Sequence, residues 1–501
     1  MKRGGSRIVA RQRNEILLFV VLISCYTYFF PRWGDWGQKS RLDLTMAIVD
    51  HGTFTIDMYH ENTGDKAFFD GHYYTDKSVG PSFLAVPVYA LVRGPLRMLT
   101  SVLEPRLQDN VALAETLLKD GGGLLFDRIY LALALTLVTA IAVSVPSALI
   151  GVLFFRFLEN FTAYSGLRLL LTLGFALGTS AFPYSGMFYQ HQPAAIALFT
   201  SFVLLYRMRV RRTSWRQSWL VGALLGFALI TDYPTVLIVV PLGLYALYHM
   251  PDKRLVILPI LGAMPVLALM VAYNLVVFKS LLPTGYFYST NWQEEHQSGF
   301  LSLTHPMWDA FWGITFSPHR GLFFFSPFLL LAWPGFYVLW RLKRYRSEFL
   351  VCLLPTLGLL LFNSSSIMWW GGYAVGPRYL IPMLPFISLT PVFFLDRHWD
   401  RPIMRSVTYA LVGLSVGLIM AVTIAGQQFP DYTWNALIDY AVPRLAGGDI
   451  ARNLGTLMHL PGWSSLIPLA VFLGMALFLI VKTRAPAATE VGTLQEVIIS
   501  D

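Results

Sequence analysis

The acidic side chains of this chain gather in one stretch, residues 31–80, which lies between two hydrophobic segments. Charge is costly within a bilayer and is retained there mainly for function, so a loop with so many titratable groups is the first place to look for an active site. The stretch holds eight of the 29 Asp and Glu residues: Asp35, Asp43, Asp50, Asp57, Glu61, Asp65, Asp70 and Asp76.

Asp35 follows the first hydrophobic segment by a few residues, which predicts a position at the mouth of any cavity there. A carboxylate so placed could accept a proton from an acceptor hydroxyl. It could also hold a divalent cation together with Asp43 or Asp57. A helix cap or a solvated loop position is the alternative for each of these residues.

Several basic side chains stand where a phosphate could meet the membrane surface. Lys77, which follows Asp76, precedes a hydrophobic piece and could contact a phosphate at headgroup height, or only lipid headgroups. His191 begins a hydrophobic segment and could bind a phosphate or a metal, or cap its helix. Arg320 and Arg378 precede hydrophobic segments on the side expected outside, against the positive-inside bias, which favours an anionic ligand.

Further candidates lie in the same loops. Arg41 in the first loop is a candidate substrate-binding residue, and Asp232 lies between two short apolar runs, where it is either functional or a helix cap. Gly371, Gly372 and Gly376 allow close backbone approach. Aromatic residues of the second large loop could stack on sugar rings or form an interfacial belt: Tyr286, Tyr288, Trp292, Trp308 and Trp312.

The elements that must position these residues are membrane helices. The 501 residues are 55% hydrophobic and 13% charged, with a mean hydropathy of +0.54. Since a helix needs roughly 20 apolar residues to cross a bilayer, we predict an all-α polytopic membrane protein with about 12–13 hydrophobic segments. The net charge of +9 indicates cytoplasmic loops rather than nucleic-acid binding. Cys25 and Cys352 lie in apolar runs and are expected to be packing residues.

Basic clusters predict the topology. Five Lys and Arg residues before residue 14 place the N-terminus in the cytoplasm, followed by an uncleaved first span. The loops 31–80, 188–193, 232–234, 279–320, 364–378 and 427–463 then all fall outside, which predicts one site on the outer surface. The predicted spans are 15–30, 129–155, 169–187, 192–206, two within 218–249, 255–278, 321–340, 349–363, 379–395, 406–426 and 464–481.

Residues 1–482 are predicted to form one transmembrane domain, with 483–501 as a disordered cytoplasmic tail. In the first loop, the pattern of 42–54 predicts an amphipathic helix on the membrane surface. The piece 81–98 either stays in the interface or crosses with the following connector. The sequence contains no nucleotide-binding motif and no internal repeat typical of transporters.

Four blocks of the sequence carry a family resemblance. SRLDLTMAIVDHGTFTID, NTGDKAFFDGHYYTDK, SPHRGLFFFSP and WWGGYAVGPRYLIP resemble blocks of the GT-C membrane glycosyltransferases. The chain looks most like bacterial family 39-like members, which are related to protein O-mannosyltransferases and lipid A aminoarabinose transferases. The resemblance extends over nearly the whole chain, to about residue 400.

The resemblance implies a polyprenyl-phosphate-linked sugar donor, inversion at the anomeric carbon and an Asp of the first loop as general base. Some members also use a divalent metal. Asp35 is most like the base, and Asp76-Lys77 resembles the block whose Lys meets the lipid phosphate. The usual Asp-Glu pair is here Asp35-Trp36, and Ser78-Val79 replaces two prolines, so Asp57 is the second candidate for the base.

We therefore expect a multi-pass cell-membrane glycosyltransferase whose donor phosphate is held by Lys77, Arg378 and Arg320. The acceptor (protein, lipid or glycan) and the metal requirement stay open, and no nucleic-acid partner is expected. A transporter or flippase for a lipid-linked sugar is the alternative, although its spans should carry more charge. A non-catalytic scaffold is a third reading of the same sequence.

Overall fold

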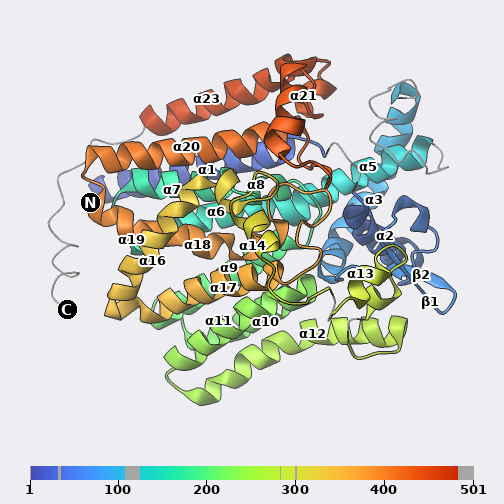
Figure 1. The fold of residues 1–501 in the computed structure, drawn as a ribbon, viewed down its shortest axis with the longest axis horizontal. Helices are drawn as coiled ribbons and strands as arrows, with labels where there is room; N and C mark the ends of the chain where they lie inside the picture. The colour runs from blue at the N-terminus through green and yellow to red at the C-terminus, as the bar shows by residue number, and fades with distance from the viewer. Residues whose placement is uncertain (1, 32–34, 108–124, 283, 300–301, 483–501) are drawn as a thin grey trace.

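Long helices run side by side along the long axis of the molecule (Figure 1). This computed structural model describes residues 2–31, 35–107, 125–282, 284–299 and 302–482. The predicted tail 483–501 and part of the connector before residue 128 lie outside the described residues. The helical architecture confirms the prediction of an all-α polytopic fold.

The helices occur in the order in which the sequence predicts its hydrophobic segments. Figure 1 labels most of them. The α-helices are α1 (Lys2–Tyr28), α2 (Trp36–His51), α3 (Gly80–Leu107), α5 (Leu125–Thr139), α6 (Val145–Phe157), α7 (Ser165–Leu177), α8 (Ala181–Tyr184), α9 (His191–Arg209), α10 (Ser218–Thr231), α11 (Val236–His249), α12 (Ile257–Phe278), α13 (Gln293–Gln297), α14 (Trp308–Thr315), α15 (Leu322–Phe325), α16 (Ala332–Arg341), α17 (Arg346–Ser364), α18 (Leu384–Leu389), α19 (Pro391–Leu395), α20 (Pro402–Ala425), α21 (Val442–Ala446), α22 (Leu454–Leu457) and α23 (Ile467–Lys482).

Shorter 3-10 and π turns extend or join these helices. The π turns are η2 (Ala140–Ser144) and η12 (Ala436–Ala441). The 3-10 turns are η1 (His60–Asn62), η3 (Leu158–Asn160), η4 (Trp215–Gln217), η5 (Tyr233–Thr235), η6 (Lys253–Val256), η7 (Gly285–Tyr288), η8 (Pro327–Leu331), η9 (Lys343–Tyr345), η10 (Arg378–Met383), η11 (Asp396–His398) and η13 (Gly462–Leu466).

Within the described residues, five helical segments are long and apolar enough to cross a membrane: Asp127–Asn160, Lys253–Phe278, Lys343–Ser364, Arg378–His398 and Pro402–Ala425. Three shorter apolar helices accompany them: Ser165–Leu177, Tyr233–His249 and Gly462–Ala476. One of these five, Arg378–His398, covers the span predicted at 379–395. It is built from shorter elements that include η10, α18 and α19, and the prolines Pro382, Pro385 and Pro391 remove backbone donors where these elements meet.

Helix α12 lies at the edge of the bundle and packs mainly on α10. Only 6% of its apolar window is buried, so most of its surface is available to lipid. The two helices touch backbone to backbone. A Cβ added at Gly222 would lie 1.8 Å from the carbonyl oxygen of Pro259, and one at Gly262 would lie 1.8 Å from that of Trp219. Glycine at these positions permits the close packing that membrane helices use.

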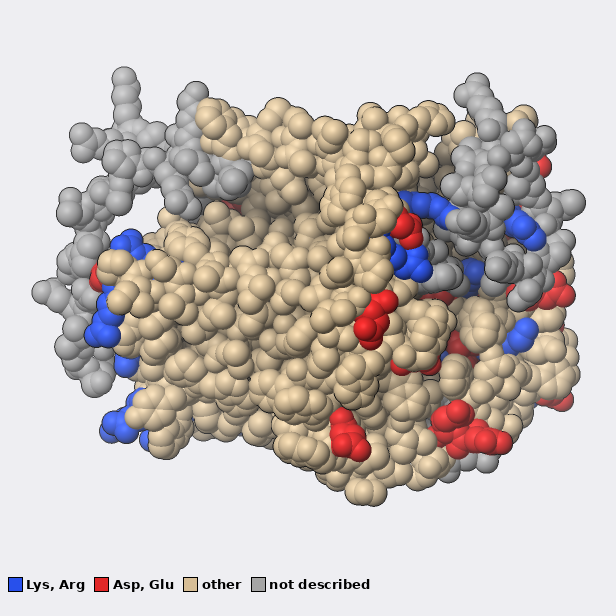
Figure 2. All heavy atoms as spheres, turned by 45° about the horizontal axis from the view of Figure 1, so that its top comes forward, with Lys and Arg blue, Asp and Glu red and all other residues tan. Residues whose placement is uncertain are grey.

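Positive charge is concentrated at the end of the bundle where α1 begins and α23 ends. Figure 2 shows Lys and Arg at that end, a largely uncharged middle and, towards the other end, most of the visible acids together with further Lys and Arg. A band without charge between two charged ends is what a bilayer requires. Exposed members of the basic group are Arg207, Arg211, Arg212, Arg216, Arg254, Lys343, Arg344, Arg346, Arg401 and Arg405.

The first loop folds at the opposite end, beside α13 of the second loop (Figure 1). Helix α2 forms where the sequence predicts a helix, but residues 37–47 are all buried. It is therefore not a surface helix with one exposed face, as predicted, because its polar side chains find partners within the protein. Helix α3 packs on α2 and α5 and stays at this end. Residues 81–98 therefore lie at this end of the molecule rather than along the length of the bundle.

A two-stranded antiparallel hairpin, β1 (Lys66–Phe69) and β2 (His72–Thr75), interrupts the otherwise helical loop. Its two turn residues, Asp70 and Gly71, have φ of 51° and 84°. Two successive positive φ angles are typical of the tight turns that match strand twist. The sequence analysis did not predict this hairpin.

Candidate functional site

The loops predicted to share one face do meet at one end of the bundle. Arg41 of α2 donates a hydrogen bond to the side chain of Gln190, before α9. Gln428, after α20, donates to Asp35 at 3.3 Å and to the hydroxyl of Tyr189 at 3.0 Å. The second large loop contributes Ser289, which bonds Asp76 at 2.9 Å. The site is thus built from segments up to 393 residues apart.

Asp35 is held at the start of α2. One carboxylate oxygen, Oδ1, accepts from the backbone N–H of Gly37 at 2.8 Å and caps the helix, and Oδ2 accepts from Gln428. The helix-cap interpretation is therefore confirmed. These hydrogen bonds leave other acceptor sites of the Asp35 carboxylate open, because an ionised carboxylate has about four of them.

Two guanidinium groups flank the ring of Tyr189. The carbon Cζ of Arg41 lies 5.8 Å from the ring centroid and that of Arg378 lies 5.1 Å from it. Arg41 is fully buried and donates to the carbonyl oxygen of Gly37 at 2.5 Å. Burial lowers the pKa of Arg41 from its usual value, against the opposing effect of nearby Tyr286, Tyr189 and Asp65. A concentration of cationic charge around one ring is suited to binding an anion.

Arg378 is half-buried, and the described residues give its guanidinium no hydrogen-bond partner or acidic partner. The ring of Tyr379 lies 5.4 Å from its Cζ. Gly371 has φ of 71°, and a Cβ added there would lie 3.0 Å from Nε of Arg378. This close approach was predicted for the glycines of the WWGGYAVG block. A half-buried Arg without a partner requires an explanation, and an anionic ligand supplies one.

Lys77 forms ion pairs with two acids, Asp65 and Asp76. Its Nζ lies 3.1 Å from Asp65 and 3.3 Å from Asp76. Burial opposes ionisation of Asp65, but the Lys77 ammonium and a 3.1 Å bond from Trp292 hold the pKa of Asp65 below its usual value. Burial raises the pKa of Asp76, and the charge of Asp65 adds to this effect. The two acids together raise the pKa of Lys77 although burial lowers it.

A small cavity of about 10 Å³ adjoins this triad. Its walls include Asp76 and Lys77, Tyr273 and Phe278 of α12, and Tyr286 of the second loop. A volume of this size admits about one water molecule.

Trp308 and Trp312 of the second large loop are 72% and 47% exposed, as interfacial aromatic residues would be.

His191 and Asp232 form a buried pair. The ring nitrogen Nδ1 of His191 lies 2.7 Å from Oδ2 of Asp232, whereas Nε2 has no partner among the described residues. The ring stacks near that of Tyr189, with centroids 6.2 Å apart. An acid bonded to one imidazole nitrogen fixes the orientation of the other. Nε2 is thus a buried ring nitrogen that the described residues leave without a hydrogen bond.

Arg320 has other partners than those the sequence suggested. It is fully buried, and its guanidinium donates to the carbonyl oxygens of His319, Trp370, Gly372 and Phe429 at 3.0–3.3 Å. Burial lowers the pKa of Arg320 to about 10. The donors that could grip a lipid phosphate are already occupied, because the side chain ties the 364–378 and 427–463 loops together.

Arg320→Met should therefore destabilise the protein, whereas Arg378→Met should weaken the binding of a polyprenyl phosphate. Loss of Arg320 leaves several carbonyl groups without donors, at a cost of about 3 kcal/mol. Thermal melts of the purified variants in detergent, together with binding of a polyprenyl phosphate below the melting temperature, separate the two effects. An Arg320→Met variant that melts like the wild type but loses donor binding would instead make Arg320 a ligand residue.

Asp57, the second candidate for the base, lies apart from this group. It bonds exposed His72 at 2.7 Å and accepts from the backbone N–H of Tyr73, also at 2.7 Å, beside the hairpin. Asp43, the other partner considered for a cation, bonds Asn62 at 3.1 Å instead. In the part of the chain that the structure describes, no three His, Cys, Asp or Glu side chains are placed to hold a metal ion. The donor set for a divalent cation is therefore not assembled there.

Asp43 is completely buried in α2, one turn after Lys39. Burial raises the pKa of Asp43 well above its usual value and lowers the pKa of Lys39 to about 8. The nearby charge of each residue opposes the effect of burial on the other. Burial therefore favours the uncharged forms of both Asp43 and Lys39 in α2.

Asp43→Asn should flatten the dependence of stability on pH. With a raised pKa, the folded protein binds more protons than the unfolded chain, so stability falls as pH rises above about 4. The variant cannot ionise at this position. Its melting temperature relative to the wild type should therefore increase between pH 5 and pH 7.5, a range in which Lys39 stays mostly protonated. Asp70→Asn, at an exposed turn, is the control; a parallel shift in both variants would contradict the role of Asp43.

Sequence reasoning missed several members of the site. Asp65 was noted only as one of seven aspartates, yet it pairs with Lys77. Tyr189 and Gln428 carry no motif, although Tyr189 is two residues before His191. Asp232 was singled out for its place between two apolar runs, and the structure places it against His191. The others become visible only when distant loops are brought together.

Comparison with known proteins yields a likeness among solved structures. No protein-family model matches the chain, and no curated protein matches it. Among solved structures, the chain is similar to the crystal structure of ArnT from Cupriavidus metallidurans bound to undecaprenyl phosphate. The two share 14% identity with a TM-score of 0.43, over 96% of this chain and 76% of that chain. The function must therefore be argued from the residues of the site.

Proposed function

We propose that this protein is a membrane glycosyltransferase that moves a sugar from a polyprenyl-phosphate donor to an acceptor hydroxyl or amine. The observation that carries the proposal is the guanidinium of Arg378 beside Tyr189, which forms no hydrogen bond or ion pair within the described part of the chain. Through Gln428, the same tyrosine is linked to the fixed carboxylate of Asp35. An anion site next to a carboxylate provides the two functions that transfer from a lipid phosphate requires.

The reaction is a single displacement with inversion. The acceptor oxygen or nitrogen attacks the anomeric carbon while the bond from that carbon to the phosphate oxygen breaks, and the bonding pair leaves with the phosphate. Asp35 accepts the proton that the acceptor loses. Arg378, Arg41 and Lys77 stabilise the charge that develops on the leaving phosphate.

His191 acts in the same region through the ring nitrogen that Asp232 does not hold. Asp232 holds Nδ1, so Nε2 can bond a phosphate oxygen or a sugar hydroxyl. Its position near Tyr189 and the two arginines supports a donor-binding role rather than an isolated helix cap.

The orientation proposed for the protein follows from its charges. The arginine-rich end is assigned to the cytoplasm by the positive-inside rule, with both termini there. The site then faces the outer surface of the cell membrane. Because α12 exposes most of its apolar surface, the donor's isoprenoid chain can stay in the bilayer while its phosphate enters the site.

Release of polyprenyl phosphate tests the proposal directly. Purified protein in lipid would be incubated with a panel of radiolabelled polyprenyl-phosphate sugars and a membrane extract as acceptor, with and without EDTA. Release that depends on acceptor and enzyme supports transfer, and the EDTA arm reports whether a divalent metal takes part. The labelled product identifies the acceptor class.

Movement of lipid-linked sugar across vesicles without transfer would contradict the proposal and favour a transporter. Binding of every donor in the panel without release of polyprenyl phosphate would also count against it. The buried charges of the described site gather at one end of the bundle rather than along a transmembrane path, which favours transfer.

A further inference from the structure

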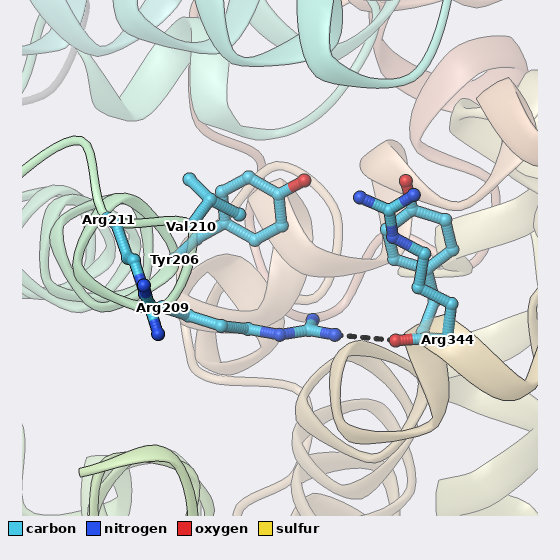
Figure 3. A pocket seen from close by; sticks show the side chains of 6 residues that line it. Tyr206, Arg209, Val210, Arg211 and Arg344 are labelled. Carbon is cyan, nitrogen blue, oxygen red and sulfur yellow. Dashed lines mark hydrogen bonds between the residues drawn. The ribbon is translucent and has the colours of Figure 1, made fainter. Parts of the chain in front are cut away.

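A second pocket opens at the arginine-rich end of the molecule, which is remote from the candidate site. Its volume is about 310 Å³, near the lower limit of small-molecule sites, which span about 300–1,000 Å³. It lies between the end of α9 and η9 (Figure 3). The lining residues are Tyr206, Arg209, Val210, Arg211, Arg344 and Tyr345.

Three guanidinium groups line this pocket, and two of them are uncompensated. Arg209 is paired with buried Glu348 and donates to the carbonyl oxygen of Arg344 at 2.6 Å, the bond drawn in Figure 3. Arg211 and Arg344 are exposed and have no acidic partner in the described part of the chain. The pocket therefore carries an excess of positive charge, and Arg209 is held in place by Glu348.

Arg211 adopts a backbone conformation that favours glycine. Its φ is 58°, and it follows the last turn of α9. The backbone N–H groups of Arg211 and Arg212 bond the carbonyls of Met208 and Arg207 at 3.0 and 2.8 Å, so the backbone itself closes the helix end. The arginine side chain is not needed as a cap, and a glycine would fit the backbone better. An outlier retained at this cost points to a role for the guanidinium.

Aromatic side chains make the wall rigid. Tyr206 and Tyr345 both pack on the ring of Phe161, with centroids 5.6 and 5.8 Å from it. The guanidinium carbon of Arg344 lies 5.8 Å from the centroid of Tyr345. Figure 3 shows the hydroxyl of Tyr206 directed across the pocket towards the guanidinium of Arg344. The Tyr206 phenol and the Arg344 guanidinium therefore face each other across the pocket, and Arg211 also lines it from the end of α9.

We propose that this pocket binds the phosphate group of a phosphomonoester or phosphodiester at the cytoplasmic end of the protein. The positive-inside bias accounts for many arginines at this end, but not for a lined cavity with a strained Arg and an oriented phenol. Guanidinium groups match phosphate oxygens in geometry and charge. The phosphate can belong to an anionic lipid headgroup or to a soluble phosphate ester. This site is independent of the proposed transfer reaction.

Thermal stabilisation of the purified full-length chain in a neutral detergent tests the site. Phosphatidylglycerol is titrated in one arm, zwitterionic phosphatidylcholine in a second and soluble glycerol 3-phosphate in a third. Arg344→Ala and Arg211→Gly should each weaken the apparent affinity for the stabilising phosphate about tenfold, the loss of one charge-assisted contact. Arg216→Ala, an exposed arginine outside the pocket, should bind as the wild type does.

Both variants are chosen to fold. Arg344→Ala keeps the backbone carbonyl that Arg209 uses, and Arg211→Gly places glycine at a positive φ. Stabilisation by phosphatidylglycerol alone assigns the pocket to a lipid headgroup, and stabilisation by glycerol 3-phosphate as well assigns it to a soluble ester. The proposal is overturned if neither stabilises the protein, or if Arg344→Ala and Arg211→Gly bind as tightly as Arg216→Ala.

Discussion

Asp35→Asn should lower turnover about 1,000-fold while leaving the fold and donor binding intact. Asparagine caps a helix about as well as aspartate, so the bond from the N–H of Gly37 is retained. The amide cannot accept the acceptor's proton, so the chemical step alone is lost. Turnover, donor affinity and melting temperature, measured on the same preparation, distinguish these effects.

Two comparisons make this result decisive. Asp35→Ala removes both the cap and the base, and should also lower stability by about 1 kcal/mol. Asp57→Asn tests the rival base, which lies beside the hairpin. Full activity of Asp35→Asn, with activity lost in Asp57→Asn, would transfer the catalytic role to Asp57.

Lys77→Met should cause the largest loss of stability among the site residues. The substitution leaves Asp65 and Asp76 buried beside each other without their shared cation, and removal of one member of a buried ionic group costs about 3–5 kcal/mol. Donor binding should fall as well, because the proposed function gives Lys77 a role in stabilising the charge on the donor phosphate. Melting temperature and binding of polyprenyl phosphate would be measured together.

A double variant separates charge balance from ligand binding. Asp65→Asn combined with Lys77→Met removes one acid with the base, so it should recover part of the lost stability but none of the donor binding. Lys77→Arg keeps the charge and serves as the control. A Lys77→Met protein as stable as the wild type would show that the two acids do not depend on this cation.

The sequence predicted those parts of the fold that depend on local patterns. Apolar length predicted most helices, and the Asp-Tyr-Pro sequence at 232–234 predicted the turn between α10 and α11. The hairpin was missed although Asp70-Gly71 lies between aromatic-rich runs, because its strands have only four residues each. Signals of that length are easily outweighed by the helical pattern around them.

The site was predictable only where a residue's position along the chain implied its environment. Lys77, His191 and Arg378 stand at segment boundaries, and all lie in the group around Tyr189 or the adjoining triad. Arg320 stands at a similar boundary, yet it bonds carbonyls of loops up to 109 residues away. The two arginines cannot be told apart by spacing, because long-range contacts determine whether the donors are free.

The backbone contact between α10 and α12 has a consequence for the accuracy of the site. Helix α12 leads directly into the loop that supplies Ser289 to Asp76 and Trp292 to Asp65. Gly222 and Gly262 thus set the position of α12 and of the loop residues that bond the acids around Lys77. A side chain added at either glycine would displace α12 together with that loop. The alignment of polar groups outside the membrane therefore depends on two residues within it that have no side chain at all.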